Sequence, residues 1–480
     1  MGTAPGRWVL VTTVLGSGLA MLDSTVVNIA LERIGSDFGA SFAGLQWTVN
    51  AYTLTLAGLI LLGGSLGDRF GRRRVFLVGV VWFAVASALC GFAPSIEVLV
   101  GARALQGVGG ALLTPGSLAL ISASFHGRDR AAAIGAWSGL GGVAGAVGPF
   151  VGGWLVEWNW RAVFLINLPM GAIVLVAALR HVPESRDPQA VAHLDVPGTV
   201  LAVAGLGALT WSLTAAGESG ASPAVLAAGA VGAVGLVAFA VVERRSRSPL
   251  VPGDLFANRR FTAANAVTLL VYAALGVLFV LLVLQLQVVA RFSPLKAGTA
   301  MLPVTALMLL LSARMGALGQ RIGPRLPMTI GLVAAAGGML LLLRVGVGAS
   351  YLTDVLPAVV LFGLGLSATV APLTATVLDA ADDRHAGVAS GVNNAVARAA
   401  GLLAVAVIPA VSGIAGSDYT DPVAFSAGYH RAVVVAAVLL LGGALLSATL
   451  LRPEKRREGR YPLEECAHCG VTGPQQYPRN

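Results

Sequence analysis

The sequence predicts an all-α membrane protein, and three observations carry the prediction. Hydrophobic residues make up 56% of the 480 residues and charged residues only 11%, whereas a soluble domain carries roughly 25% charged residues. The mean hydropathy is +0.80. Apolar runs close to the roughly twenty residues that cross the hydrocarbon core recur along almost the whole chain. Because the backbone finds no water there, each run must form a helix.

Fourteen such runs can be placed along the chain. The first, residues 8–31, is too long for the core of a signal peptide, so we expect it to be a retained span. The other thirteen are expected near residues 46–66, 75–93, 96–122, 132–156, 162–180, 196–216, 223–242, 262–290, 297–318, 326–345, 354–378, 387–413 and 430–451. An even number of spans places both termini on one side of the membrane.

The basic residues predict which side that is. Of the 32 Arg and Lys residues, 24 fall on the terminal segments and on alternate loops, and only six fall on the other loops. Cytoplasmic loops carry an excess of Arg and Lys. We therefore expect a multi-pass protein of the cell inner (plasma) membrane with both termini in the cytoplasm, and we read the net charge of +9 as orienting the chain in lipid rather than binding nucleic acid.

An internal repeat divides the chain. The segment Gly64-Ser-Leu-Gly-Asp-Arg-Phe-Gly71 matches Gly316-Ala-Leu-Gly-Gln-Arg-Ile-Gly323 at an offset of 252, and Asp129-Arg130 matches Asp383-Arg384 at an offset of 254. Two matches at nearly one offset indicate two homologous halves. We expect a six-span half at 1–180, two inserted spans at 181–255, a second six-span half at 256–452 and a cytoplasmic tail at 453–480. Two six-helix halves around a midplane cavity are the architecture of the major facilitator superfamily.

The loop after the second predicted span resembles the cytoplasmic signature loop of that superfamily. The match rests on Gly64, Gly67, Asp68, Arg69, Gly71 and Arg72. The glycines allow a tight turn, and Asp68 can pair with an arginine or a helix N-terminus at a cytoplasmic gate. A basic loop that only orients the chain needs neither the aspartate nor the glycine spacing.

The fifth predicted span resembles the antiporter signature of exporters. It carries Gly148, Pro149, Gly152 and Gly153, although Ala144 stands where that pattern has glycine. Small residues let helices approach closely, and Pro149 bends the helix. Ordinary glycine-mediated packing, equally present in an importer, is the alternative.

Further segments extend the resemblance to the fourteen-span drug:proton antiporters of the EmrB/QacA type. They are Leu22–Ala30, Gln46-Trp47 with Tyr52, Trp160–Pro169, and Ser293–Gly298 with Pro303. The resemblance implies a proton-coupled antiporter that exports small hydrophobic or amphiphilic drugs, antibiotics or dyes by alternating access. A proton-coupled metabolite transporter on the same fold is the alternative, because a fold alone does not fix function.

Two charged residues within spans are candidates for proton coupling. Asp23 lies deep in the first span, where an ionisable residue is a functional candidate by default. Burial favours the protonated form of a carboxyl group, so such a group can take up and release a proton. Arg103 lies in the fourth span, within a segment that resembles the superfamily motif linked to proton coupling. Both are roughly 12 Å from the outer face, so the two side chains can meet. A permanent structural ion pair is the alternative.

Other intramembrane polar residues are candidates for the substrate cavity: Asn50, Gln106, Gln285, Asn393 and Arg398. Hydrogen bonding between helices of the bundle is an equally good interpretation. Arg398 has the stronger case, because an unpaired cation in a span is expensive.

The sequence favours no enzyme, cofactor or metal. No predicted span presents paired catalytic carboxylates, a His cluster or a nucleophile beside a base. Cys466-Ala-His-Cys469 supplies at most three ligands, and a closed zinc site needs four. The expected partners are a small-molecule substrate, protons and the lipid bilayer, without nucleic acid, and we expect a monomer.

Overall fold

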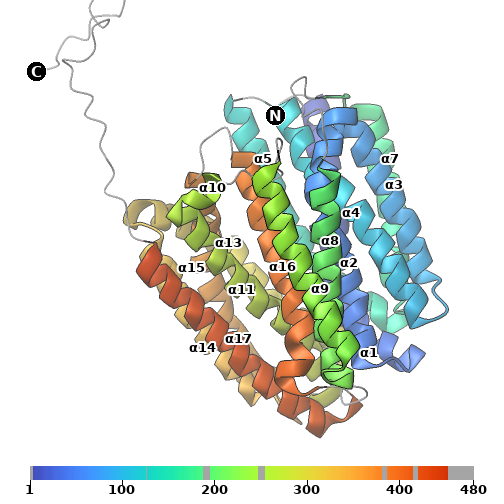
Figure 1. Cartoon of the computed structure of the whole chain (residues 1–480), viewed down its shortest axis with the longest axis vertical. Coiled ribbons are helices and arrows are strands. Elements are labelled where there is room, and N and C mark those ends of the chain that lie inside the picture. Colours follow the sequence, from blue (N-terminus) through green and yellow to red (C-terminus); the bar gives the residue numbers. More distant parts are fainter. Residues whose placement is uncertain are drawn as a thin grey trace, which may run out of the picture.

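The computed structural model describes residues 4–125, 127–186, 195–246, 254–380, 386–414 and 420–451. Within these ranges the chain is a bundle of helices without strands (Figure 1). Thirteen described helical segments are long and apolar enough to cross a membrane. Together with α5, many of whose side chains lie outside the description, they occupy the positions of the fourteen predicted spans. The predicted tail, including Cys466 and Cys469, lies outside the described residues.

The first six predicted spans form α1 to α7. Their bounds are Ala4–Phe38 for α1, Phe42–Phe70 for α2, Arg72–Gly91 for α3, Ile96–Ser124 for α4, Gly127–Trp158 for α5, Ala162–Leu165 for α6 and Asn167–His181 for α7. Serine hydroxyls at Ser41 and Ser95 accept hydrogen bonds from the first turns of α2 and α4, as favoured N-caps do. The sixth span is broken at Ile166, so Asn167 begins a new helix.

The two inserted spans form a hairpin of α8 (Val196–Ser219) and α9 (Pro223–Arg245). Asp195 accepts a hydrogen bond from the amide of Gly198 and so caps α8. Helix α8 packs against α2 and α16, whereas α9 packs on α8. The hairpin therefore covers one side of the bundle, where the two halves adjoin (Figure 1).

The predicted second half begins with the short α10. Its elements are α10 (Asp254–Ala257), α11 (Arg259–Leu284), a π-helical turn (Gln285–Val289), α12 (Pro294–Thr299), α13 (Leu302–Ile322), α14 (Arg325–Leu341), a 3₁₀ turn (Leu342–Arg344), a π-helical turn (Tyr351–Val355), α15 (Leu356–Asp379), α16 (Ala386–Ser412) and α17 (Pro422–Leu450). Gly71 and Gly323 occupy the same place in the repeat, and both have positive φ values, +112° and +88°. Each glycine lies between the end of one helix and the start of the next. Glycine adopts a positive φ there without strain because it has no side chain.

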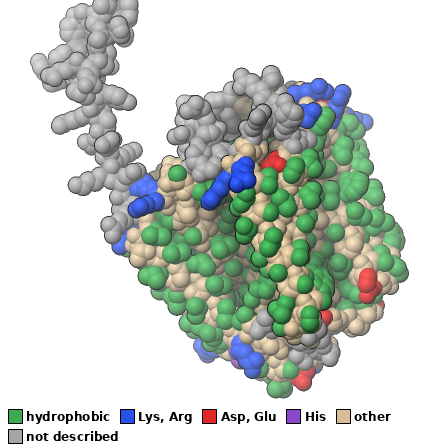
Figure 2. All heavy atoms as spheres, in the orientation of Figure 1, with side chains coloured by type: hydrophobic (Ala, Val, Ile, Leu, Met, Phe, Trp, Pro, Cys, Tyr) green, Lys and Arg blue, Asp and Glu red, His purple; other side chains and the backbone are tan. Residues whose placement is uncertain are grey.

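The surface divides into an apolar belt and charged ends. Hydrophobic side chains cover the flanks of the visible face, and Lys and Arg side chains gather towards its two ends (Figure 2). This distribution suits a bundle surrounded by lipid. The N-terminal end and α10 lie at one end of the bundle (Figure 1), which is the end that the basic loops predict to be cytoplasmic.

Candidate functional site

Asp23 and Arg103 meet inside the first half. Asp23 is on α1 and Arg103 on α4, and their side chains are 0% and 1% exposed. The Arg103 Nη1 atom lies 2.5 Å from Asp23 Oδ2. This confirms the contact expected from their similar depth in the membrane. A buried pair of this kind is retained only when further hydrogen bonds satisfy both charges.

Further hydrogen bonds to Asp23 come from α4 itself and from α7, and a hydroxyl on α3 joins the two donors. Gln106 Nε2 donates to Asp23 Oδ1 at 2.8 Å, and Asn167 Nδ2 donates to the same oxygen at 3.0 Å. The hydroxyl of Ser87 on α3 accepts from Gln106 at 3.1 Å and from Asn167 at 2.9 Å. All of these side chains are fully buried. We call Asp23, Ser87, Arg103, Gln106 and Asn167 the carboxylate cluster.

Arg103 is fixed on its other sides as well. Its Nε donates to the carbonyl of Thr48 at 3.0 Å, and its Nη1 donates to Gln106 Oε1 at 2.6 Å. The guanidinium lies 4.3 Å from the ring centroid of Tyr52, a cation–π arrangement. The arginine is therefore held in one orientation, with Asp23 as the only carboxylate among the described residues to which it pairs.

Two members of the carboxylate cluster, Ser87 and Asn167, were not predicted from the sequence. Asn167 lies in the segment Trp160–Pro169 that carries part of the family resemblance, but the direction of its side chain depends on the helix break at Ile166. Ser87 carries no sequence signal, because serine hydroxyls are common in membrane helices. By the internal repeat, Asp23 and Arg103 map near Gly276 and Val359 in the second half. Gly276 packs against Gly401 and Val359 is buried in the apolar core.

The signature loop forms a local ion pair and a capped helix start. Asp68 Oδ1 lies 2.8 Å from Arg72 Nε, with both side chains partly exposed. The N-terminus of α3 is bound instead by Glu184, whose carboxylate accepts from the amides of Arg73 at 3.0 Å and Arg74 at 3.2 Å. A carboxylate suits that position because a helix N-terminus is partly positive. Asp68 is thus paired with an arginine, and the helix N-terminus has a partner that the sequence did not indicate.

The remaining loop residues serve the turn and the helix packing. A Cβ atom on Gly71 would lie 2.8 Å from the Glu184 carboxyl carbon, and the positive φ of +112° there favours glycine. Gly64 faces Pro115 of α4, and Gly67 lies beside Arg72. The guanidinium of Arg69 lies 5.2 Å from the ring centroid of Phe70.

The antiporter motif joins α5 to α1 and to the second half. Gly148 faces Thr25, and Gly152 faces Val26 with a Cβ distance of 3.0 Å to its side chain. A Cβ on Gly153 would come within 2.5 Å of the Cα of Leu295, on α12. The contact is reciprocal, because a Cβ on Gly298 of α12 would collide with the carbonyl of Pro149.

Other contacts close the same end of the bundle. Gln287 Nε2 donates to the carbonyl of Ile29 at 3.1 Å, and Gln46 Nε2 donates to the carbonyl of Val405. Each bond joins one half to the other. A hollow of about 380 Å³ lies outside this closure, lined by Glu32, Arg33, Glu157, Gln287, Arg291, Phe292, Ser293 and Pro294.

The candidate cavity residues separate into three groups. Asn50 is fully buried, and both polar atoms of its side chain lack a partner, as does the Nε of Arg398. Arg398 is on α16, a helix that packs against α2 and α8, so it lies near the boundary between the halves.

Gln285 and Asn393 instead make hydrogen bonds within the second half. Gln285 Nε2 donates to the carbonyl of Val345 at 2.8 Å. Asn393 Nδ2 donates to Asn265 at 3.1 Å and to Thr268 at 2.8 Å. Gln106 belongs to the carboxylate cluster. Helix-to-helix bonding is therefore the role that the contacts of Gln285 and Asn393 favour.

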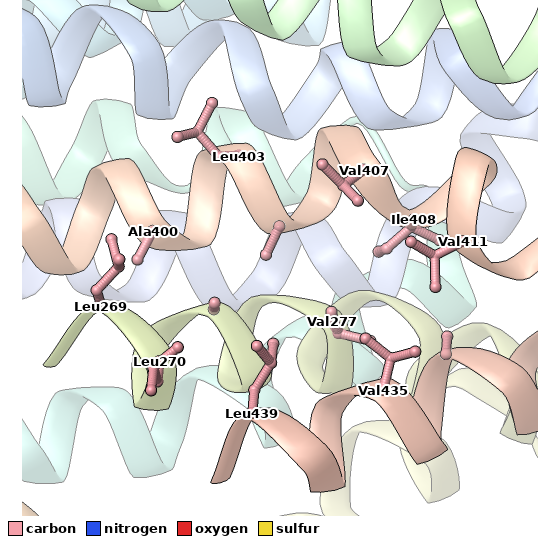
Figure 3. A pocket seen from close by; sticks show the side chains of 13 residues that line it. Leu269, Leu270, Val277, Ala400, Leu403, Val407, Ile408, Val411, Val435 and Leu439 are labelled. Atoms are coloured by element: carbon pink, nitrogen blue, oxygen red, sulfur yellow. The ribbon is translucent and has the colours of Figure 1, made fainter. Parts of the chain in front are cut away.

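An apolar groove of about 310 Å³ lies between α11, α16 and α17 (Figure 3). Its lining is Leu269, Leu270, Ala273, Val277, Ala400, Leu403, Ala404, Val407, Ile408, Val411, Ala432, Val435 and Leu439. No lining residue carries a charge or a side-chain hydrogen-bonding group. The groove is therefore distinct from the carboxylate cluster.

Two helical halves, closed against each other at one end and holding a buried carboxylate–arginine pair, define a membrane transporter. The chain belongs to the Major Facilitator Superfamily, whose family profile matches residues 13–405. Several of the relatives that it matches are named as resistance or export proteins.

Three of these relatives cover most of the chain. It is 38% identical to the puromycin resistance protein of Streptomyces alboniger, over 94% of this chain and 91% of that protein. It is 36% identical to the multidrug resistance protein Stp of Mycobacterium tuberculosis, over 84% and 75%. It is 35% identical to the cephamycin export protein CmcT of Amycolatopsis lactamdurans, over 93% of each chain.

The fold also matches a solved transporter. A bacterial homologue of the human lysosomal transporter Spinster, in an inward-facing and unoccupied conformation, superimposes with a TM-score of 0.64 at 19% identity. The alignment covers 95% of this chain and all of that one. At this identity the likeness establishes the fold alone.

Proposed function

We propose that this chain is a proton-coupled antiporter that exports small hydrophobic or amphiphilic compounds, antibiotics among them, by alternating access. The relatives named for puromycin resistance, multidrug resistance and cephamycin export support the substrate class. The single observation that carries the proton coupling is the carboxylate cluster, in which a fully buried Asp23 is paired to Arg103.

Protonation of Asp23 changes the energy of this closed arrangement. The ionised carboxylate accepts from Arg103, Gln106 and Asn167. A proton on Asp23 removes the negative charge and leaves the buried cation of Arg103 unpaired, which costs about 3–5 kcal/mol. Reversing a two-state equilibrium from 1:99 to 99:1 needs about 5.5 kcal/mol. One protonation therefore supplies most of the free energy that switches the halves to another arrangement.

The order of events follows from this coupling. The ionised cluster accompanies the arrangement in which α5 and α12 are in contact and that end of the bundle is closed. Protonated and ionised Asp23 favour different arrangements of the halves, and substrate and proton compete for one cavity. A proton binds Asp23 from that end while the end is open and substrate leaves. The proton is released to the opposite side while that end is closed. Entry of protons from outside then drives export.

The orientation of the chain in the membrane is part of the proposal. The excess of basic residues supports cytoplasmic termini, and with that orientation the closed end of the bundle is the outer one. Cysteine labelling of intact cells tests this, because Cys466 and Cys469 are then inside. Reaction of either thiol with an impermeant reagent contradicts the orientation.

The substrate class is tested by efflux from cells that express the chain. A panel of antibiotics and dyes, including puromycin, is loaded with and without a proton gradient. We expect faster efflux of several compounds only when the gradient is present. Uptake instead of efflux favours a proton-coupled importer, and export confined to one metabolite favours a metabolite exporter.

A further inference from the structure

The inserted helix α8 lies in register with α2. Three close contacts set this register: Gly58 with Val203, Gly207 with Leu54, and the amide of Ala43 with Glu218 Oε1 at 3.2 Å. The two helices run in opposite directions, so each step back along α2 is a step forward along α8. Asn50 of α2 is therefore level with the part of α8 that contains Thr210 and Thr214.

These threonines share the face of α8 that meets α2. Residues 203, 207, 210 and 214 are three or four positions apart, a spacing that puts them on one side of a helix. On α2, Gln46 is one turn before Asn50 and reaches α16, where its Nε2 donates to the carbonyl of Val405. Leu54 is one turn after Asn50 and touches α8. Asn50 thus lies at the junction of α2, α8 and α16.

Several polar atoms at this junction are buried without a hydrogen-bond partner. They are Nδ2 and Oδ1 of Asn50, the hydroxyls of Thr210 and Thr214, and Oε1 of Gln46. The four side chains are at most 1% exposed. Unpaired buried polar atoms are costly, and most native ones have a partner in protein, water or ligand. Neither acidic nor basic side chains are in this set.

We propose that Gln46, Asn50, Thr210 and Thr214 form a subsite that binds uncharged hydrogen-bonding groups of the transported compound, such as hydroxyl, carbonyl or amide groups. The proposal rests on the proposed function and deepens it. An amide side chain and a hydroxyl both donate and accept, so together they suit a neutral polar group. Helices α2 and α16 belong to different halves, so the junction between them changes as the halves move. Helix α8 thereby contributes to substrate choice.

Equilibrium binding to the purified full chain in lipid nanodiscs, without any gradient, tests the subsite. The probes are puromycin, which carries hydroxyl and amide groups, and tetraphenylphosphonium, which carries no hydrogen-bonding group. The double variant Thr210→Val/Thr214→Val keeps side-chain shape and removes both hydroxyls. We expect its affinity for puromycin to fall about tenfold, the worth of one hydrogen bond, and its affinity for tetraphenylphosphonium to stay unchanged. The double variant Thr210→Ser/Thr214→Ser keeps both hydroxyls and should bind puromycin as wild type does.

A matched control lies on the same helix. Thr199→Val removes a hydroxyl that already donates to the carbonyl of Asp195 at 2.8 Å, and it should leave the ratio of the two affinities unchanged. If the ratio of the two affinities is unchanged in Thr210→Val/Thr214→Val and its melting temperature is raised, the two hydroxyls bind water rather than substrate. That result overturns the subsite. A wild-type chain that does not bind puromycin also overturns it. Because binding is read without a gradient, this outcome is separate from any failure of proton-driven export.

Discussion

Removing the hydrogen bond from Asn167 should shift the pH at which the transporter switches. Asn167→Leu keeps a similar side-chain volume but removes the donor that lies 3.0 Å from Asp23 Oδ1. A hydrogen bond to a charged group contributes about 1.5–3 kcal/mol. The donor stabilises the ionised carboxylate, so its loss favours the protonated form. At about 1.36 kcal/mol per pH unit, the midpoint of the pH-dependent step should rise by about one to two units.

The assay is substrate efflux from proteoliposomes measured over a range of pH. Asn393→Leu is the matched control, because Asn393 is also an intramembrane asparagine with two side-chain hydrogen bonds, but in the second half. It should lower stability and leave the midpoint in place. Equal shifts in both variants, or none in Asn167→Leu, would refute the assignment of Asn167 to the carboxylate cluster.

Three further predictions follow from the other contacts. Arg103→Ala should raise the pH midpoint of substrate binding, because the Asp23 carboxylate loses its counter-charge. Arg103→Lys should recover part of the shift, because lysine restores the charge but not the planar guanidinium group. Substrate binding with a wild-type pH midpoint in both variants would contradict the pairing role. Asp68→Asn should slow transport while leaving melting temperature and substrate binding nearly intact, because a partly exposed ion pair contributes only about 0–1 kcal/mol; equal losses of binding and transport would point to misfolding. Gly298→Ala should separate the halves at the closed end, because a Cβ there collides with the carbonyl of Pro149. The control Gly101→Ala should leave the halves in contact, because a Cβ on Gly101 meets nothing within 4 Å. Distances between spin labels across that end test the prediction, and equal distances in the two variants would contradict it.

Hydropathy and internal repetition predicted much of the fold. The repeat marked by Gly71 and Gly323 appears as matching positive-φ breaks between helices. Depth alone was enough to predict that Asp23 and Arg103 meet, because each span has a defined start in the membrane. What a span buries against its neighbours depends on its rotation about its own axis, and a uniformly apolar helix gives little indication of that rotation.

The parts of the site that the sequence did not predict depend on this rotation. Asn393 was a cavity candidate, yet it points at Asn265 and Thr268 within its own half. Asn167 points at Asp23 because the sixth span breaks just before it. Similarly, Gly153 and Leu295 are far apart in the sequence, and only packing of the two halves brings them together.

Export driven by a pH gradient alone tests the central claim most directly. Asp23→Asn keeps the shape of the side chain and its place beside Arg103 but removes the proton that can be exchanged. In proteoliposomes with an imposed pH gradient as the only energy source, wild-type protein should concentrate substrate against its gradient. The variant should bind substrate and equilibrate it without concentrating it. A variant that still concentrates substrate under that gradient would contradict Asp23 as the coupling site and would direct attention to Arg398 and the second half.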